Sequence, residues 1–313
     1  MNFTESCFSH FNPQRYNQPF FVDESIQLSI KEKGYCVMDL LNENDLVKLR
    51  DGFEQVCESV KGEFGEQFWP SGRHESVAVR NLAKKSVEAV VPKKLVPIFV
   101  EGSYTFIGGT YLVKPPSQNS ALNPHQDSAH VNELECFSVY AWIPLQDVDD
   151  KNGAVKVLPG SHRIDIKQRS LNVPWILEPY VKLLDEYMIS VPMKAGQVLL
   201  FDAALIHSSP PNFSRDYRVA VNFYIHNTQS PFTHFYRDEN TPSYQVEMYA
   251  VSPEFYYSED FESKPSEKYP FIGYQQQFIP SISENELKDL LNVISSKKGS
   301  FLTQIINTLR FKS

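Results

Sequence analysis

A histidine and an aspartate two positions apart, His125 and Asp127, are the residues whose types and spacing first suggest chemistry in this chain. On an extended segment, side chains two apart point to the same face, so the imidazole and the carboxylate project side by side. Such a pair can bind a divalent metal from one side and leave room for a third ligand and for reactants. A surface turn is the alternative interpretation, because histidine is common outside metal sites as well.

A third ligand is offered by His207, which follows the apolar run 197–202 and leads into a Ser-Ser-Pro-Pro turn. Taken alone, a histidine in this position is more often a core residue. Shortly afterwards, however, Arg218 opens an alternating apolar strand. A buried arginine is costly unless it pairs with an anion, and its guanidinium fits a carboxylate with two hydrogen bonds. The ordered set of four residues is therefore more specific than any one of its members.

Other polar residues have simpler interpretations. His130 and His162 are rival imidazoles, but His162 lies in a Pro-Gly-Ser-His-Arg turn and ranks below His207 as a metal ligand. Gln126 should point away from the metal by strand alternation. Asn222 and Tyr224 share the face of Arg218 and are candidate contacts of a cosubstrate or substrate. A basic group in the segment 70–100, which includes Arg73, His74 and Arg80, is expected to be a solvated face.

Composition restricts the class of protein. The chain has 313 residues, 42% hydrophobic and 22% charged, with a net charge of -8, which is typical of a soluble globular domain. This charge argues against binding to nucleic acid or to an anionic membrane, and no apolar run is long enough to span a bilayer. Four scattered cysteines without a Cys-x-x-Cys pair, and the lack of a signal peptide, predict a cytoplasmic protein. The sequence does not specify an oligomeric state.

The strand pattern predicts the fold class. Short alternating runs occupy 105–114, 136–143, 154–158, 188–192, 197–202 and 218–225, separated by turn signals rather than long helices. This arrangement favours an antiparallel sandwich or barrel over a parallel sheet. We predict a single domain over 1–313, in which an N-terminal arm and helices (1–104) precede a β core (105–226) and an aromatic-rich segment with a C-terminal helix (227–313). An insert at 164–187 interrupts the core.

Helices are expected on both sides of this core. A short strand at 34–39 precedes a helix from about Asn42, which Asp45 helps to cap, and a capping box at Ser283 starts the C-terminal helix. The apolar stripe of that last helix is expected to pack on the body of the protein, with partner binding as the minority interpretation. The aromatic residues in 227–280 and the insert at 164–187 are candidate lids over a pocket, and ordinary packing is the alternative.

Several motifs in order resemble the phytanoyl-CoA dioxygenase family of iron- and 2-oxoglutarate-dependent oxygenases. They are Pro-His-Gln-Asp at 124–127, Trp-Ile-Pro-Leu at 142–145, Gly-Ala at 153–154, Leu-Pro-Gly-Ser-His-Arg at 158–163 and the stretch from His207 to Arg218. The resemblance covers roughly residues 30–230, and the order of the motifs makes it specific. It implies a mainly β fold with flanking helices, a double-stranded β-helix of the jelly-roll or cupin type.

The resemblance also implies roles for individual residues. His125, Asp127 and His207 would bind Fe(II), and Arg218 would bind the distal carboxylate of the cosubstrate 2-oxoglutarate. Ser209 would donate to a bound carboxylate or simply cap the turn, and Trp142 would lie near 2-oxoglutarate or be a core aromatic. Three protein ligands leave three positions of an octahedral iron for 2-oxoglutarate and dioxygen. Related halogenases lack the carboxylate ligand, so Asp127 favours hydroxylation or desaturation.

The implied function is the hydroxylation of an unactivated C–H bond in a small metabolite or natural-product intermediate, with release of succinate and carbon dioxide. Two alternatives remain open from the residues alone. One is a non-redox metal-dependent barrel enzyme, such as an isomerase or hydrolase, and the other is a catalytically inactive binding protein. The substrate is not fixed by fold or cosubstrate. Phytanoyl-CoA itself is not favoured, because no basic cluster is evident for the phosphates of coenzyme A.

Overall fold

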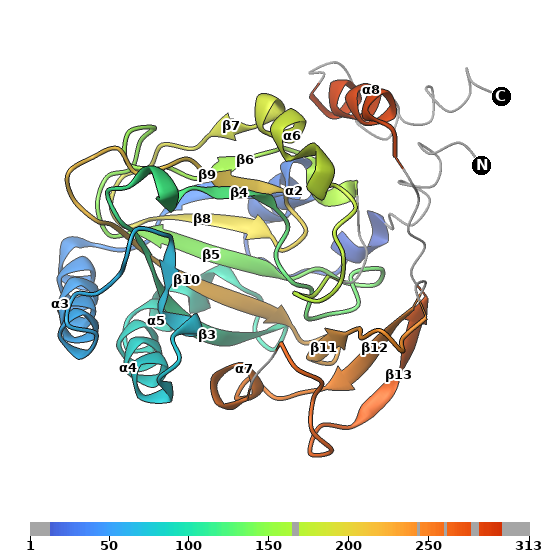
Figure 1. Ribbon diagram of the computed structural model, residues 1–313, viewed down its shortest axis with the longest axis horizontal. Helices are drawn as coiled ribbons and strands as arrows, with labels where there is room; N and C mark the ends of the chain where they lie inside the picture. The colour runs from blue at the N-terminus through green and yellow to red at the C-terminus, as the bar shows by residue number, and fades with distance from the viewer. Residues whose placement is uncertain (1–12, 165–168, 243–244, 260–261, 277–281, 296–313) are drawn as a thin grey trace.

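Two antiparallel sheets face each other in the computed structural model, which describes residues 13–164, 169–242, 245–259, 262–276 and 282–295 (Figure 1). In spatial order the larger sheet contains β1 (Tyr35–Asp39), β8 (Gln197–Asp202), β5 (Val139–Pro144), β10 (Arg218–Asn227), β3 (Tyr104–Lys114) and β2 (Trp69–Pro70). The smaller sheet contains β4 (Leu122–His125), β9 (His207–Ser209), β6 (Lys156–Val157) and β7 (Ile189–Ser190). Mainly β architecture with flanking helices is therefore confirmed.

The alternation of side chains on the central strands separates two cores. On β5, Val139, Ala141 and Ile143 pack into the cluster that lies between the large sheet and the helices. Trp142 points to the opposite face and packs with residues of both sheets. Because successive side chains of a strand alternate faces, one face of the large sheet supports helices and the other lines the interior between the sheets. The sequence prediction of this alternation is confirmed, although β5 begins at Val139 and not at Cys136.

Helices cover the outer face of the large sheet. They include α2 (Glu24–Lys33), α3 (Glu43–Ser59), α4 (Val77–Glu88) and α5 (Val91–Leu95), and Figure 1 shows α3, α4 and α5 together on one side. The capping box of α3 is formed, because the Asn42 side chain accepts a hydrogen bond from the Asp45 backbone N–H and the Asp45 carboxylate accepts one from the Asn42 backbone N–H. The first part of the predicted N-terminal arm, residues 1–12, lies outside the described residues.

The described residues of the region 227–276 form secondary structure that the sequence interpretation missed. They form a third, three-stranded sheet of β11 (Thr233–Tyr236), β12 (Gln245–Ala250) and β13 (Phe271–Gln276), together with α7 (Phe255–Ser258). The sequence analysis named no strand in this region. Prolines and clustered aromatic residues obscure the period of two in this part of the sequence.

The insert and the C-terminal helix pack together. The insert carries α6 (Val181–Tyr187), and α8 (Glu284–Ser295) begins after the predicted capping box, in which Glu286 N–H donates to Ser283 Oγ at 3.3 Å. The stripe Leu287, Leu290 and Leu291 is buried against Leu183 and Leu184. The expectation that this helix packs on the body of the protein is confirmed. Within the described residues, no helix is both long and apolar enough to cross a membrane.

Candidate metal centre

Two histidines and an aspartate converge where the small sheet opens toward the large one. His125 ends β4 and His207 begins β9, and the two residues are direct partners in the antiparallel register of these strands. Asp127 follows β4 and places one carboxylate oxygen 3.7 Å from His125 Nε2 and the other 3.7 Å from His207 Nε2. The three potential ligand atoms lie within 4.8 Å of one another. A single divalent ion at this place would meet two imidazole nitrogens and one carboxylate oxygen.

Backbone carbonyls orient both imidazoles toward that place. His125 Nδ1 lies 2.7 Å from Asn123 O, and His207 Nδ1 lies 3.0 Å from Leu205 O. A carbonyl only accepts, so each Nδ1 carries the proton and each Nε2 keeps a free lone pair. Burial, together with a smaller contribution from the nearby His207, lowers the pKa of His125 to about 4. The imidazole of His125 is therefore neutral at pH 7, which is the form that binds a metal.

Arg218 is the second element of the site. It begins β10, its side chain is almost fully buried, and its Cζ lies 5.3 Å from the centre of the Trp142 ring. Its Nε and Nη1 have no hydrogen-bond partner among the described residues. Burial lowers its pKa to about 9, yet the guanidinium remains charged at pH 7. A buried cation with two unused donors requires an anionic partner, and a carboxylate matches the planar fork.

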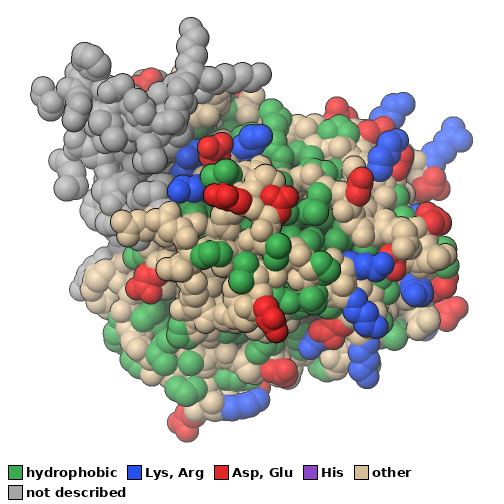
Figure 2. Space-filling model, turned by 180° about the vertical axis from the view of Figure 1, so that it is seen from behind, with side chains coloured by type: hydrophobic (Ala, Val, Ile, Leu, Met, Phe, Trp, Pro, Cys, Tyr) green, Lys and Arg blue, Asp and Glu red, His purple; other side chains and the backbone are tan. Residues whose placement is uncertain are grey.

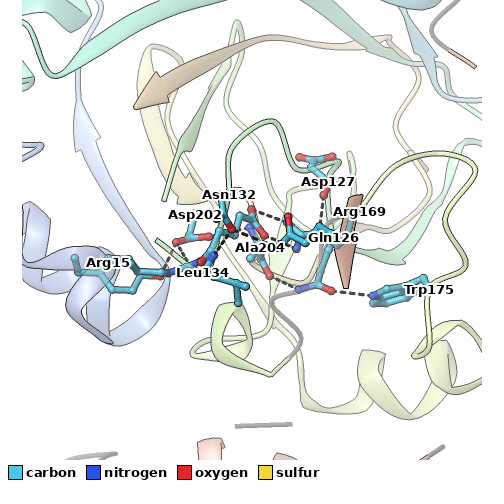
Figure 3. A network of polar contacts seen from close by, with 12 residues as sticks. Arg15, Gln126, Asp127, Asn132, Leu134, Arg169, Trp175, Asp202 and Ala204 are labelled. Carbon is cyan, nitrogen blue, oxygen red and sulfur yellow. Dashed lines mark hydrogen bonds and ion pairs between the residues drawn. The ribbon is translucent and has the colours of Figure 1, made fainter. Parts of the chain in front are cut away.

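The backbone of Asp127 is fixed by the insert (Figure 3). Arg169 Nε donates to Asp127 O at 2.8 Å, and its two terminal nitrogens bind both carboxylate oxygens of Glu133 at 2.6 and 2.8 Å. The neighbouring Gln126 donates to Ala204 O and accepts from Trp175 Nε1 at 2.8 Å. These bonds tie the segment that bears Asp127 both to the insert and to the loop that precedes His207.

The same network reaches the N-terminal part of the described chain. Arg15 Nη1 donates to Glu133 O at 2.8 Å, and Arg15 Nη2 binds Asp202 Oδ2 at 2.9 Å (Figure 3). Asp202 in turn accepts from Ala204 N–H at 2.8 Å. Arg15 and Asp202 are both buried. Two buried charge pairs therefore surround the backbone of the candidate metal ligands, and each charge has a hydrogen-bonded partner as burial requires.

A cavity of about 880 Å³ contains the three candidate ligands and Arg218. Pockets of about 300–1,000 Å³ are typical for small molecules. Trp142 and Ser209, which the sequence analysis named as candidate contacts of 2-oxoglutarate, both line this cavity, as do Asn222 and Gln126. Asn222 Oδ1 is buried without a hydrogen-bond partner among the described residues.

Ser209 is held in place by a buried lysine that the sequence analysis did not single out. Lys114 Nζ donates to the carbonyls of Ser120, Ser209 and Pro210 at 2.5, 3.2 and 2.8 Å. Lys114 is the register partner of Arg218 across β3 and β10. Burial lowers the pKa of Lys114 to about 6, and the positive charge of Arg218 contributes.

The rival histidines lie outside the cluster of ligand atoms. His162 is buried under the N-terminal helix, with Nε2 at 3.1 Å from Lys31 O. His130 Nδ1 lies 3.0 Å from the hydroxyl of Tyr256, which is also 3.0 Å from His234 Nδ1. In the described part of the chain, His125, Asp127 and His207 are the side chains that lie close enough together to bind one metal ion.

Arg73 is a residue of the site that sequence reasoning missed. It was expected on a solvated face, and it is exposed, but it lines the cavity that also contains Asp127, and its charge lowers the pKa of His125. Arg80 from the same basic group is half-buried, and its terminal nitrogens donate to His74 O and Tyr257 O, both at 2.8 Å. No local signal in the sequence separates these two arginines from an ordinary charged surface.

An antiparallel jelly roll with a His/Asp/His cluster and a buried arginine in one cavity is the arrangement expected of a non-haem iron oxygenase. Residues 30–220 match the family model described as phytanoyl-CoA dioxygenase (PhyH). The match covers more than half of the chain. The chain therefore belongs to the phytanoyl-CoA dioxygenase family, and the resemblance stated from the motifs is confirmed. Members of this family use Fe(II) and 2-oxoglutarate.

Curated relatives match over part of their length. Phytanoyl-CoA dioxygenase domain-containing protein 1 of Danio rerio is 25% identical over 189 residues, which are 57% of this chain and 65% of the relative. The 1-deoxypentalenic acid 11-beta-hydroxylase of Streptomyces arenae is 31% identical over 132 residues, which are 38% of this chain and 46% of the relative. The chain thus spans under two thirds of the length of these relatives.

Among solved structures, the non-haem alpha-ketoglutarate-dependent carbocyclase SnoK from nogalamycin biosynthesis has the same fold. The alignment has a TM-score of 0.50 and 18% identity, and it covers 84% of this chain and all of the carbocyclase. This likeness concerns the fold alone. It agrees with the double-stranded β-helix predicted from the sequence.

Proposed function

We propose that the protein is an Fe(II)- and 2-oxoglutarate-dependent dioxygenase that hydroxylates an unactivated C–H bond of a small metabolite or natural-product intermediate. The observation that carries this proposal is the presence, in one cavity, of a three-ligand cluster and a buried arginine with unused donors. The donor set fits the metal, because two imidazoles and one carboxylate are the facial ligands of non-haem ferrous oxygenases. The orphaned guanidinium fits the cosubstrate, because it needs a carboxylate.

His125, Asp127 and His207 would hold the iron, and Arg218 would hold the distal carboxylate of 2-oxoglutarate. When bound, iron and 2-oxoglutarate activate dioxygen, so that one oxygen atom enters the substrate and the other enters succinate as carbon dioxide leaves. Trp142 would pack against the guanidinium that holds the cosubstrate, and Ser209 would offer a hydroxyl to a bound carboxylate. The residues of the chain thus bind, orient and shield the reactants.

The partners under this proposal are a small-molecule substrate and dioxygen, with no nucleic acid and no membrane. The net charge of -8 supports the exclusion of nucleic acid. We also propose a cytoplasmic location, which is supported by three cysteines that are free in the described chain, namely Cys36, Cys57 and Cys136.

The test is the release of succinate from 2-oxoglutarate by the full chain with ferrous iron, with and without dioxygen. We expect oxygen-dependent succinate in the wild type, and a loss of at least 100-fold, on the order of 3 kcal/mol, in Asp127→Ala. Asp147→Ala, which changes an exposed carboxylate outside the cavity, is the matched control and should keep full activity. Succinate release that persists without dioxygen, or that Asp127→Ala leaves intact, would favour the non-redox or inactive alternatives.

A further inference from the structure

Tyr256 places its phenol hydroxyl between two buried imidazoles, and nothing in the proposed function uses this arrangement. It lies in α7, and its hydroxyl oxygen is 3.0 Å from His130 Nδ1 and 3.0 Å from His234 Nδ1. The ring centres of Tyr256 and His130 are 4.8 Å apart. Tyr256 lines the 880 Å³ cavity and also a smaller cavity of about 160 Å³, and Asp127 lines both cavities as well. The phenol and a candidate metal ligand therefore border the same two spaces.

The direction of these two hydrogen bonds follows from the other ring nitrogen of His234. A neutral imidazole carries one proton, and a phenol hydroxyl can donate to one neighbour and accept from another. His234 Nε2 is buried and has no hydrogen-bond partner among the described residues. A buried N–H without an acceptor is rarer in proteins than an acceptor without a donor, so His234 carries its proton on Nδ1. His234 therefore donates to the Tyr256 oxygen, and Tyr256 donates its own proton to His130 Nδ1.

The protonation states of Tyr256 and His130 suit a proton transfer that accompanies the loss of an electron. Burial raises the pKa of Tyr256 well above its ordinary value, so the hydroxyl keeps its proton in the resting protein. Burial, with smaller contributions from His234 and His226, lowers the pKa of His130 to about 3, so this imidazole is unprotonated at neutral pH. A phenol that loses an electron becomes a strong acid, and it gives up its proton readily when a base is already hydrogen-bonded to it. His130 is that base.

A series of aromatic rings in contact connects His130 to a candidate metal ligand. The ring centres of His207 and Phe201 are 4.8 Å apart, and those of Phe201 and Tyr140 are 5.6 Å apart. Tyr224 continues the series, because its ring centre lies 5.0 Å from that of Tyr140 and 5.0 Å from that of His130. All of these distances are within the range of about 4.5–7 Å that is typical of packed aromatic pairs. An electron can therefore pass to the metal through packed side chains without crossing solvent.

We propose that Tyr256 is a redox-active tyrosine, which is oxidised when iron has reacted with dioxygen and 2-oxoglutarate while no substrate occupies the cavity. This inference rests on the proposed function, which supplies the oxidant. The phenol loses one electron, which reduces the oxidised iron by one unit, and its proton moves along the existing hydrogen bond to His130 Nδ1. A neutral phenoxyl radical and a protonated imidazole remain. A one-electron reductant such as ascorbate returns the electron, and the proton moves back to the phenol oxygen. The oxidising equivalent is thereby drawn away from the side chains that line the cavity.

The test detects the radical itself. The full chain with Fe(II) and 2-oxoglutarate is mixed with dioxygen in the absence of substrate, frozen after short intervals and studied by electron paramagnetic resonance. We expect the spectrum of a neutral tyrosyl radical in the wild type, which narrows when the protein is made with ring-deuterated tyrosine. Tyr256→Phe keeps the ring but removes the hydroxyl, and it should abolish this spectrum. Tyr257→Phe is the matched control and should keep it, because Tyr257 lines the same cavity but has no imidazole on its hydroxyl among the described residues.

The two histidines give a second comparison, which a purely structural role of these hydrogen bonds would not produce. A glutamine in either position can still form a hydrogen bond with Tyr256, but it cannot take up a proton. His130→Gln should therefore lower the yield of the radical by roughly tenfold or more. His234→Gln keeps a donor to the phenol oxygen and should leave the yield nearly unchanged. Thermal unfolding shows that each variant is folded. An equal loss in both variants, or no loss in His130→Gln, overturns the inference.

Failure of the proposed function would look different. Succinate released without substrate is measured on the same samples, and mass spectrometry of their peptides locates any oxygen added to the protein. We expect more added oxygen on the side chains of the cavity in Tyr256→Phe than in the wild type or in Tyr257→Phe. If the wild type releases no oxygen-dependent succinate, the oxygenase proposal fails, and the role of Tyr256 fails with it. If succinate is released but no tyrosyl radical forms, or if Tyr256→Phe retains the radical, the oxygenase proposal survives and the role of Tyr256 alone is overturned.

Discussion

At the scale of residues, the candidate site depends on which nitrogens of its histidines and of Arg218 already have a hydrogen-bond partner in the protein. The Nδ1–H groups of His125 and His207 are used by backbone carbonyls, so their Nε2 atoms are free to bind a metal. The Arg218 guanidinium, in contrast, has two buried nitrogens that donate to no partner among the described residues. One metal bound to the Nε2 atoms and one dicarboxylate bound to the Arg218 guanidinium would give these buried polar groups their partners.

Replacing Arg218 by glutamine should weaken the binding of 2-oxoglutarate by roughly 10- to 100-fold, because a charge-assisted fork is lost from a buried place. The affinity for the metal should change much less, since Arg218 is not one of the three candidate ligands. Calorimetric titration of the Zn(II)-loaded protein with 2-oxoglutarate measures the first quantity, and competition with a chelator measures the second. Equal affinity for 2-oxoglutarate in the variant and the wild type would remove Arg218 from the site.

The residue types alone were sufficient to predict the metal cluster and Arg218, because few other roles suit a His-x-Asp pair, a distant histidine and a buried arginine in this order. Arg73 could not be predicted in the same way. It stands among other basic residues, and only the three-dimensional position separates it from Arg80, which fixes two backbone carbonyls. The role of a charged residue on a surface depends on the cavity that it borders, and a cavity has no local sequence pattern.

At the scale of elements, the insert is a support for the metal ligands. Arg169 joins Asp127 O to the carboxylate of Glu133, and Trp175 joins the insert to Gln126. Sequence reasoning located this insert by its break in the strand pattern but assigned it the role of a possible lid. A side chain that binds a backbone carbonyl of a ligand residue leaves no periodic trace, so this supporting role required the structure.

Arg169→Lys should lower the affinity for Fe(II) by roughly 10-fold, because the planar fork that fixes the backbone of Asp127 is lost while the buried charge is kept. A matched control is Arg50→Lys, since Arg50 likewise bonds a carbonyl, Leu145 O, and a carboxylate, Glu43, far from the metal ligands. Anaerobic competition with a chelator gives the affinities. If both variants lose the same affinity, Arg169 has no specific role in positioning Asp127.

The strands were predicted more accurately at their centres than at their ends. Alternation predicted β3, β8 and β10 almost to the residue, whereas the run 154–158 pairs only over Lys156–Val157. Sequence alternation shows which side chains share a face, but the length of a ladder depends on the partner strand. The third sheet escaped prediction because prolines and clustered aromatic residues obscure the period of two in its strands.

At the scale of the whole molecule, the site is connected to distant parts of the chain through buried charges. Arg15 near the start of the described residues reaches Asp202 at the end of β8 and the backbone of Glu133. On the face shown in Figure 2, Lys and Arg side chains are interspersed with Asp and Glu, and no histidine is visible among the described residues. Several histidines, among them His226 and His234, are buried, which has a consequence for the pH dependence of stability.

The stability of the protein should fall as the pH is lowered from about 6.5 toward 4. Burial lowers the pKa of His226 to about 4 and that of His234 to about 4. The unfolded chain takes up protons near its ordinary pKa of about 6.5 before the folded chain does, so acid favours unfolding. The contribution of the neutral histidines to the stability of the folded protein is complete above their ordinary pKa. It is lost as the pH falls through their pKa in the folded state.

His226→Gln removes one of these titrations. We expect its unfolding free energy to depend less on pH between about 4 and 6.5, by up to on the order of 3 kcal/mol across this range. Urea denaturation at several pH values, followed by tryptophan fluorescence, measures the difference. An unchanged slope would show that His226 is protonated in the folded protein or that its pKa is not depressed.

The central claim is that His125, Asp127 and His207 share one ferrous ion while Arg218 holds 2-oxoglutarate. A crystal structure of the anaerobic complex with Fe(II) and 2-oxoglutarate, with anomalous scattering recorded at the iron edge, tests it most directly. The account predicts one anomalous peak bonded to the two Nε2 atoms and the Asp127 carboxylate, with the distal carboxylate of 2-oxoglutarate on the Arg218 guanidinium. A peak elsewhere, or a cosubstrate that leaves Arg218 without a partner, would contradict it.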